Sequence, residues 1–317
     1  MGAGRQAGSG NSWEPFYTEA ARNFDPSALA AGHMAEVAGL AAREYGGRPA
    51  VSTQLPSGHC ATLDFDAVDR LTDDFAVFLR AAAGLRGGDV VALMTPNCID
   101  FVLAAFGVFK AGCICTNVNP LYTAPEVEHQ LADSGAKALV IVDLFGDKAD
   151  AAVGRSAVKT VVKVSLLDFF PPVRRALLGF VLAKVEKKVP PMATPHLTMS
   201  DALRQGARLR ARSAIDINGY RAGQSLDDTA IYQYTGGTTG RSKGAELTHR
   251  NILTNAAVAT SMIDDGQGTA NMDCTLVALP LYHITAFALI MLPGLIRGAH
   301  SVMVPSPRPA SNLRAAF

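Results

Sequence analysis

Short apolar runs alternate with helical patterns along the first half of the chain. Residues 89–94 (DVVALM) form a continuous apolar run typical of a buried strand, and an apolar helical pattern follows through Phe109. The sequence CICTNV at 113–118 predicts the next strand. Asn97 stands before the helix with Asp100 three residues later, so we expect Asn97 to cap that helix. The segment predicts a β-α-β unit.

A second helix and strand repeat the order. Thr123 and Glu126 have the spacing of a capping box, with Pro125 in the first turn, and Gly135 is placed to end the helix. The sequence KALVIVD at 137–143 then predicts a strand. Continuous apolar strands separated by helices predict an α/β fold of mostly parallel sheets flanked by helices on both faces.

The last third of the chain returns to the same alternation. It predicts strands at 230–235, 275–280 and 301–305, a helix capped by Thr248, and a helix over 286–298.

The pattern loosens in the middle of the chain, where proline pairs and polar residues interrupt it. We therefore expect a polar, poorly ordered N-terminus at 1–30, a first α/β subdomain at 31–220 with a basic insertion near 165–191, and the start of a second subdomain at 221–317. Ser311 predicts the cap of one more helix, so the second subdomain is expected to be truncated at the C-terminus.

Composition narrows the function classes. The 317 residues are 49% hydrophobic, enough for one large or two medium globular domains. With 29 Lys and Arg against 28 Asp and Glu, the chain lacks the basic character of a nucleic-acid-binding protein, so a small-molecule ligand is expected. Five cysteines without a C-x-x-C pair favour buried thiols in a reducing cytoplasm over a zinc site. The apolar run at 276–296 is interrupted by prolines and a histidine, which favours buried elements over a membrane span.

The sequence YTGGTTGRSKGAELTHRN at 234–251 carries the clearest candidate chemistry. Its glycines let the backbone approach a ligand closely, so successive N–H groups can face an anion. Its threonines add hydroxyl donors, and Lys243 adds a positive charge. The combination suits a polyphosphate. The P-loop spacing G-x-x-x-x-G-K-[ST] and the dinucleotide spacing G-x-G-x-x-G both fail here, and a flexible surface hairpin is the alternative.

The same stretch resembles the phosphate-binding motif of the adenylate-forming superfamily. The flanking sequences GDVVALMTPN, FGVFKAGCICTNVNPLYTAPEVEHQLADSGAKALVIVD and ALPLYHITAF are most similar to bacterial long-chain fatty-acid–CoA ligases, in their N-terminal portion. Glu246 departs from the apolar residue usual there. The resemblance implies the incomplete N-terminal domain of the acyl-CoA synthetase fold.

The resemblance also implies site residues. His283 would lie in the substrate pocket, although a buried structural histidine is the alternative, and Thr239 would reach Mg²⁺ through ATP. His249 and Arg250 are expected to serve the start of a helix and solvent contact instead. The residues that would bind the ATP phosphates are Thr235, Gly236, Gly237, Thr238, Thr239, Gly240 and Lys243.

The implied reaction activates a long-chain fatty acid with ATP and Mg²⁺ to an acyl-adenylate, and then transfers the acyl group to coenzyme A. Family motifs for the metal-holding glutamate, the ribose-binding aspartate and the adenylation lysine do not occur in the sequence, so we expect this chain alone to be inactive. Three alternatives stay open: a truncated, non-catalytic fragment, a ligase for a medium-chain or aryl acid, and a nucleotide-sensing module.

One further stretch, 173–189, combines apolar residues at helical spacing with an excess of lysine and arginine. Val173, Leu177, Val181 and Val185 would share one face. Such a basic amphipathic helix fits peripheral contact with the inner face of a membrane, and it equally fits a solvated surface helix packed on the domain.

Overall fold

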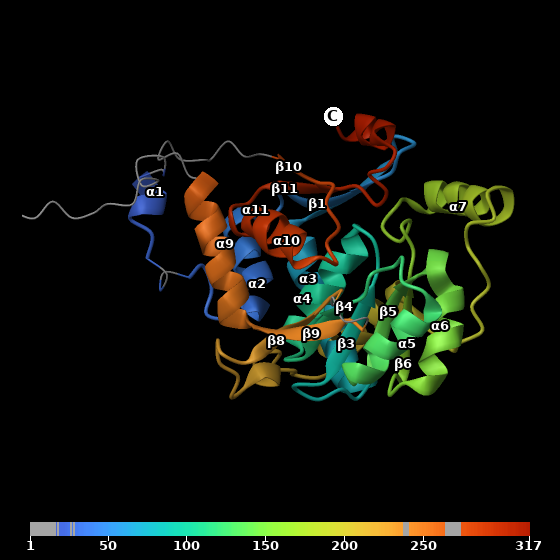
Figure 1. The fold of residues 1–317 in the computed structure, drawn as a ribbon, viewed down its shortest axis with the longest axis horizontal. Helices are drawn as coiled ribbons and strands as arrows, with labels where there is room; N and C mark the ends of the chain where they lie inside the picture. Colours follow the sequence, from blue (N-terminus) through green and yellow to red (C-terminus); the bar gives the residue numbers. More distant parts are fainter. Residues whose placement is uncertain (1–16, 18, 26, 28, 237–240, 264–273) are drawn as a thin grey trace, which may run out of the picture.

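The computed structural model places two sheets one above the other, with helices between and around them (Figure 1). The described residues are 17, 19–25, 27, 29–236, 241–263 and 274–317.

The larger sheet has seven strands, and all its pairs are parallel except the last, β8 with β9. Its strands in spatial order are β7 (Leu197–Thr198), β6 (Thr160–Val164), β5 (Ala138–Val142), β3 (Val90–Met94), β4 (Ile114–Asn117), β8 (Thr229–Thr235) and β9 (Lys243–Thr248).

The smaller sheet has four strands, in the order β10 (Cys274–Val277), β11 (His300–Met303), β1 (Pro49–Gln54) and β2 (Cys60–Asp64). Only β1 and β2 pair antiparallel within it. Each sheet therefore takes strands from both sides of residue 220. The boundary expected there does not separate the sheets, and as a division between folding units it stays a prediction.

Helices cover both faces of the larger sheet, as the sequence predicts. Side chains of β3 alternate between two clusters: Val91 and Leu93 face the main core with α4, whereas Ala92 and Met94 face α5 and α6. The main α-helices are α2 (Val37–Tyr45), α3 (Phe65–Val77), α4 (Ile99–Lys110), α5 (Ala124–Asp133), α6 (Gly146–Ala152), α7 (Pro172–Phe180), α8 (Met199–Arg212) and α9 (His249–Ile263). Shorter pieces are α1 (Glu19–Arg22), α10 (Ile284–Ala286), α11 (Leu292–Ile296), and the 3-10 or π turns η2 (Met34–Glu36), η3 (Phe78–Ala82), η4 (Asp143–Phe145), η5 (Val153–Arg155), η6 (Val181–Val185), η7 (Asn218–Arg221), η8 (Phe287–Met291) and η9 (Ala310–Ala316).

Most predicted elements are present with shifted ends. The strands expected at 89–94, 113–118, 137–143, 230–235, 275–280 and 301–305 correspond to β3, β4, β5, β8, β10 and β11. The expected helix at 286–298 is the continuous run α10–η8–α11. The capping box of α5 is confirmed, since the Thr123 amide donates to a Glu126 carboxylate oxygen at 2.7 Å.

Two predicted caps are wrong. Cys98, not Asn97, occupies the N-cap position of α4, because the Asn97 side chain makes longer-range hydrogen bonds instead. Ser311 lies inside the terminal 3-10 helix η9, which begins at Ala310 after Pro309.

Candidate functional site

Asn97 connects the two sheets through a buried side chain. It lies on the loop between β3 of the larger sheet and α4, and only 3% of its surface is exposed. Its Nδ2 donates to the carbonyl oxygens of Val277 and Leu279, both at 2.9 Å, and its Oδ1 accepts from the Leu281 amide at 2.8 Å. These three partners belong to β10 of the smaller sheet and the loop after it. One amide side chain therefore satisfies three backbone groups and sets the spacing of the sheets at this point.

Gln233 makes a second connection to the same loop. It is the polar residue in the otherwise buried run of β8, and 5% of its surface is exposed. Its Nε2 donates to the Tyr282 carbonyl oxygen at 3.3 Å. The strand that leads into the glycine-rich stretch is thereby held against the loop that carries His283.

An apolar hollow of ≈ 590 Å³ opens at this junction. Each of its walls follows the carboxyl end of a strand, which is where ligands bind in open α/β sheets. The larger sheet and the loop after β10 supply most of the lining, and the segment after β11 supplies the rest. The lining residues are Pro96, Asn97, Pro120, Leu121, Leu144, Phe145, Leu166, Ala278, Leu279, Pro280, Tyr282, Pro305, Ser306, Pro307 and Arg308.

The glycine-rich stretch joins the two strands of a β-hairpin. Thr235 at the end of β8 pairs with Lys243 at the start of β9, and both side chains are exposed. A Cβ added at Gly236 would meet nothing within 4 Å, so open space surrounds the backbone there. A hairpin is not the strand–loop–helix arrangement of a P-loop, in agreement with the spacing argument. The predicted phosphate-binding residues Gly237, Thr238, Thr239 and Gly240 lie outside the described residues.

The hairpin rests on α5 through Tyr234. The Tyr234 hydroxyl donates to Asp133 Oδ2 at 2.6 Å, and burial together with this carboxylate raises the pKa of Tyr234, which keeps the phenol a donor. A Cβ added at Gly244 would lie 3.0 Å from the Tyr234 ring, so the ring packs closely against the backbone of β9. A larger residue at 244 would therefore need the Tyr234 ring to shift.

A second hollow, of ≈ 650 Å³ and with several charged residues in its lining, lies between the hairpin and α5. His129 on α5 makes a hydrogen bond at 3.1 Å to the carbonyl oxygen of Ser242. Arg241 lines the hollow beside Ser242, and Arg155 lines it from η5, where it pairs with Glu128 at 3.3 Å. Two arginines and two glutamates, Glu126 and Glu128, therefore line the space between α5 and the base of the hairpin.

His283 is exposed at the N-cap of α10, which contradicts the alternative of a buried structural histidine. Its ring lies 4.9 Å from the ring of Tyr282, centroid to centroid. Tyr282 lines the apolar hollow. His283 is therefore the last residue of the loop after β10, next to a residue that lines the hollow, although it is not itself among the lining residues.

His249 departs from the expected solvent contact. It begins α9, as predicted, but it is buried, and its ring contacts that of His33 with centroids 3.5 Å apart and the ring planes tilted by 36°. Burial lowers the pKa of His249 to about 3 and that of His33 to about 4, so both rings are neutral near pH 7. Arg250 does face solvent, where it pairs with Asp227 at 2.6 Å.

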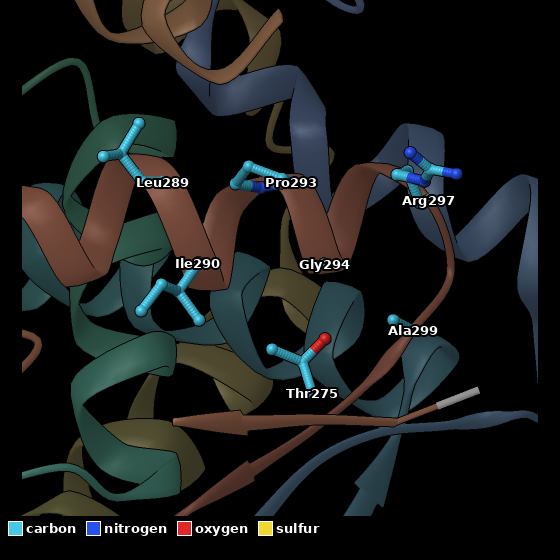
Figure 2. A pocket seen from close by; sticks show the side chains of 7 residues that line it. All are labelled: Thr275, Leu289, Ile290, Pro293, Gly294, Arg297 and Ala299. Carbon is cyan, nitrogen blue, oxygen red and sulfur yellow. The ribbon is translucent and has the colours of Figure 1, made fainter. Parts of the chain in front are cut away.

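A third hollow is smaller and shares no residue with the other two. It measures ≈ 180 Å³ and lies between the α10–η8–α11 helix and β10 (Figure 2). Its wall is apolar apart from Thr275 and Arg297, and the predicted site residues that the structure describes do not line it. We therefore place the candidate site at the junction of the sheets and the hairpin.

The described residues limit what could hold a metal. Within them, no group of three or more His, Cys, Asp or Glu side chains could bind a metal ion. All five cysteines are free thiols, and burial raises the pKa of Cys113 to about 12. Mg²⁺ commonly takes only one or two protein ligands and completes its shell with substrate phosphates and water. The exposed Thr235 and Lys243 at the hairpin fit a metal–phosphate ligand of that kind. Across the same described portion, no helix has the length and apolar character needed to cross a bilayer.

The family follows from a comparison with known proteins. The model of the family described as AMP-binding enzyme matches residues 40–316. The chain belongs to the AMP-binding enzyme family. Enzymes of this family use ATP, Mg²⁺ and coenzyme A.

Several similar proteins are named long-chain-fatty-acid–CoA ligase. The chain is 38% identical to a long-chain-fatty-acid–CoA ligase of Haemophilus influenzae, over 84% of this chain and 46% of the relative. It is 37% identical to the protein of that name from Yersinia pestis, over 84% and 45%. A long-chain-fatty-acid–CoA ligase from Archaeoglobus fulgidus shares the fold, with a TM-score of 0.63 and 21% identity, over 88% of this chain and 48% of that one. The chain thus spans less than half the length of the curated relatives it matches.

Sequence reasoning missed the groups that join the sheets. The sequence pattern predicted Asn97 as a helix cap, and it did not identify Gln233 as a site residue. A signal existed for Gln233, because a lone amide in a buried apolar strand needs a hydrogen-bond partner. The hollow could also have been located from the ends of the predicted parallel strands alone.

Proposed function

We propose that this chain forms part of an enzyme that activates a long-chain fatty acid with ATP. In the first step, a carboxylate oxygen attacks the α-phosphorus of ATP and pyrophosphate leaves. In the second, the thiol of coenzyme A attacks the acyl carbonyl and AMP leaves. The observation that carries the proposal is the placement of an apolar hollow beside a glycine-rich hairpin, with Gln233 connecting the hairpin strand to the loop between them. The names of the relatives at 37% and 38% identity support the same substrate class.

The residues present suit the charges of this reaction. A carboxylate and a triphosphate repel each other, so the site must offset negative charge and hold both groups in line. Lys243 and the Thr235 hydroxyl, with the glycine-rich backbone from Gly236 to Gly240, would bind the phosphates. Thr239 would contact Mg²⁺ held by those phosphates. His283 would lie beside the acyl carboxylate, where its exposed ring can donate a hydrogen bond.

The hollow at the sheet junction favours an alkyl substrate. Leucine, proline and phenylalanine side chains dominate its wall. Each methylene group of a substrate that is buried against such a surface favours binding by about 0.8 kcal/mol. A medium-chain or aryl acid would bury less of it. We therefore infer a long acyl chain directed away from the hairpin into this hollow.

The test is binding of hydrolysis-resistant acyl-adenylate analogues, measured by calorimetry. Acyl sulfamates of adenosine with hexadecanoyl, octanoyl and benzoyl groups would be compared with adenosine sulfamate alone. The proposal expects the hexadecanoyl analogue to bind tightest, and Leu144→Glu in the hollow to weaken it. Leu289→Glu in the smaller hollow is the matched control and should leave binding unchanged.

Each alternative has its own outcome. Tightest binding of the benzoyl analogue would indicate an aryl acid ligase, and equal binding of every compound, adenosine sulfamate included, would indicate a nucleotide-binding module without an acyl site. A non-catalytic fragment would bind the hexadecanoyl analogue yet show no pyrophosphate exchange with ATP, Mg²⁺ and palmitate. Exchange would be measured on the chain alone and on the chain fused to the remaining residues of a relative.

A further inference from the structure

The helix formed by α7 and the π turn η6 packs on the protein through one face only. Leu178 and Leu182 on that face contact the main core. Arg175, on the same face, donates from Nη2 to Asp168 Oδ1 at 2.7 Å. These contacts fix the rotation of the helix about its axis.

The opposite face is apolar and exposed. Val173, Leu177 and Phe180 follow the i, i+4, i+7 spacing of one helical stripe, on the side away from Leu178 and Leu182. Their exposed fractions are 81%, 65% and 61%. Phe180 takes the place on this stripe that the sequence pattern gave to Val181, which is partly buried. Figure 1 shows α7 at the periphery of the molecule, away from both sheets.

Four exposed cationic side chains belong to the same segment as this stripe. Arg174, Lys184, Lys187 and Lys188 are all exposed, whereas the one acidic residue of the segment, Glu186, pairs with Lys188 at 2.5 Å. The whole chain has a formal net charge of only +1, so the segment is far more basic than the rest of the protein. The positive charge and the exposed apolar stripe therefore lie on one segment, formed by the α7–η6 helix and the residues directly after it.

We propose that this helix binds the surface of an anionic lipid bilayer. Val173, Leu177 and Phe180 would enter the boundary between headgroups and acyl chains, and the flanking lysines and Arg174 would bind lipid phosphates. An amphipathic helix that has one apolar face and nearby basic residues, and that is too short to span a membrane, lies in the plane of the interface. The cationic residues of the segment select an anionic bilayer over an apolar protein partner. The inference does not depend on the reaction proposed above.

The experiment is sedimentation of the purified chain with lipid vesicles. Vesicles of phosphatidylcholine alone would be compared with vesicles that contain phosphatidylglycerol, at low and high salt. Binding should need the anionic lipid and should weaken at high salt, because screening shortens the range of the attraction. Each lysine near an anionic surface contributes about 1 kcal/mol, so Lys184→Gln with Lys187→Gln should lower affinity about 25-fold.

Two matched variants keep the proposal falsifiable. Leu177→Glu with Phe180→Glu should abolish binding, whereas Met262→Glu, at an exposed apolar position on α9, should not change it. All the replaced side chains are exposed, so circular dichroism and melting temperature should stay unchanged and show that the variants fold. The proposal is overturned by equal binding to neutral and anionic vesicles, by no binding, or by wild-type binding of the Leu177→Glu, Phe180→Glu variant. A doubled mass in light scattering that this variant abolishes, without vesicle binding, would assign the face to a second copy of the chain instead.

Discussion

The junction between the sheets and the glycine-rich hairpin form two sides of one candidate site, yet they are built differently. At the junction, the buried amide of Asn97 makes three hydrogen bonds to the loop after β10. At the hairpin, Thr235 and Lys243 are exposed, and the contacts that hold it lie at its base. The difference indicates that the hollow is shaped before ligand arrives, whereas the hairpin side chains are available for a charged ligand.

The largest effect is expected at Asn97. Replacement by leucine leaves the Leu279 carbonyl and the Leu281 amide without this partner, whereas the Val277 carbonyl still accepts from the Val304 amide at 3.2 Å. A buried polar group that loses its partner costs about 1–3 kcal/mol. Asn97→Leu should therefore lower the free energy of unfolding by about 2–4 kcal/mol in urea denaturation. Asn255→Leu, at an exposed position on α9, is the control and should change it by less than about 0.5 kcal/mol. Equal effects of the two variants would mean that Asn97 does not hold the sheets together.

A smaller effect on the free energy of unfolding is expected when the pH is lowered, because two buried histidines lie at and near the start of α9, just after the hairpin. The folded-state pKa values of His249 and His33, about 3 and about 4, lie below the ordinary value of 6.5. The stability that the neutral rings contribute is therefore fully present above pH 6.5 and is lost as the pH falls from 6.5 towards about 4 for His33 and about 3 for His249.

Lowering the pH from 7.5 to 5.5 should reduce the free energy of unfolding by about 1–2 kcal/mol for the two histidines together, after a discount for their residual contact with solvent. The His33→Gln, His249→Gln variant should lose less stability than the wild type over the same range, as measured by urea denaturation at both pH values. The buried Asp100 and Asp168 have raised pKa values, so their contribution to stability changes with pH in the opposite direction. Both aspartates are present in the wild type and in the variant, so they do not affect the comparison. An unchanged pH dependence in the variant would exclude the histidine pair as its source.

Next in size is Tyr234→Phe, which removes the hydrogen bond to Asp133 at the base of the hairpin. Asp133 is exposed and regains water, so the expected loss is about 1 kcal/mol in thermal or urea unfolding. Tyr232→Phe, two residues earlier, is the matched control, because its hydroxyl makes no such contact among the described residues. If the two variants are equally stable, α5 does not support the hairpin through Tyr234.

Sequence patterns predicted the architecture well because strand and helix periods are local properties. The strands β3, β4 and β5 and the α5 capping box follow directly from apolar runs and spacing. The boundary at residue 220 does not coincide with a division between the sheets, because β1 pairs with β11 and β4 with β8 across long stretches of chain, and such pairing leaves no local signature.

The candidate site likewise has one part that could be predicted from the sequence and one part that could not. The glycine-rich motif is legible in the sequence, since residue types and spacing carry its chemistry. The roles of Asn97 and Gln233 depend on partners about 180 and about 50 residues away, so the sequence alone could not assign them. The contact between the His249 and His33 rings is likewise a tertiary contact between distant segments.

The most direct test of the site is the affinity of the purified chain for Mg-ATP, with Lys243→Ala as the variant. Lys243 is exposed, so its replacement should change the free energy of unfolding by less than about 0.5 kcal/mol. A charged hydrogen bond to phosphate contributes about 1.5–3 kcal/mol, so Lys243→Ala should weaken Mg-ATP binding at least about tenfold in a calorimetric or fluorescent-nucleotide titration. Lys159→Ala, at an exposed lysine before β6, should leave the affinity unchanged. Equal affinities of the wild type and Lys243→Ala would contradict the assignment of the hairpin as the triphosphate site.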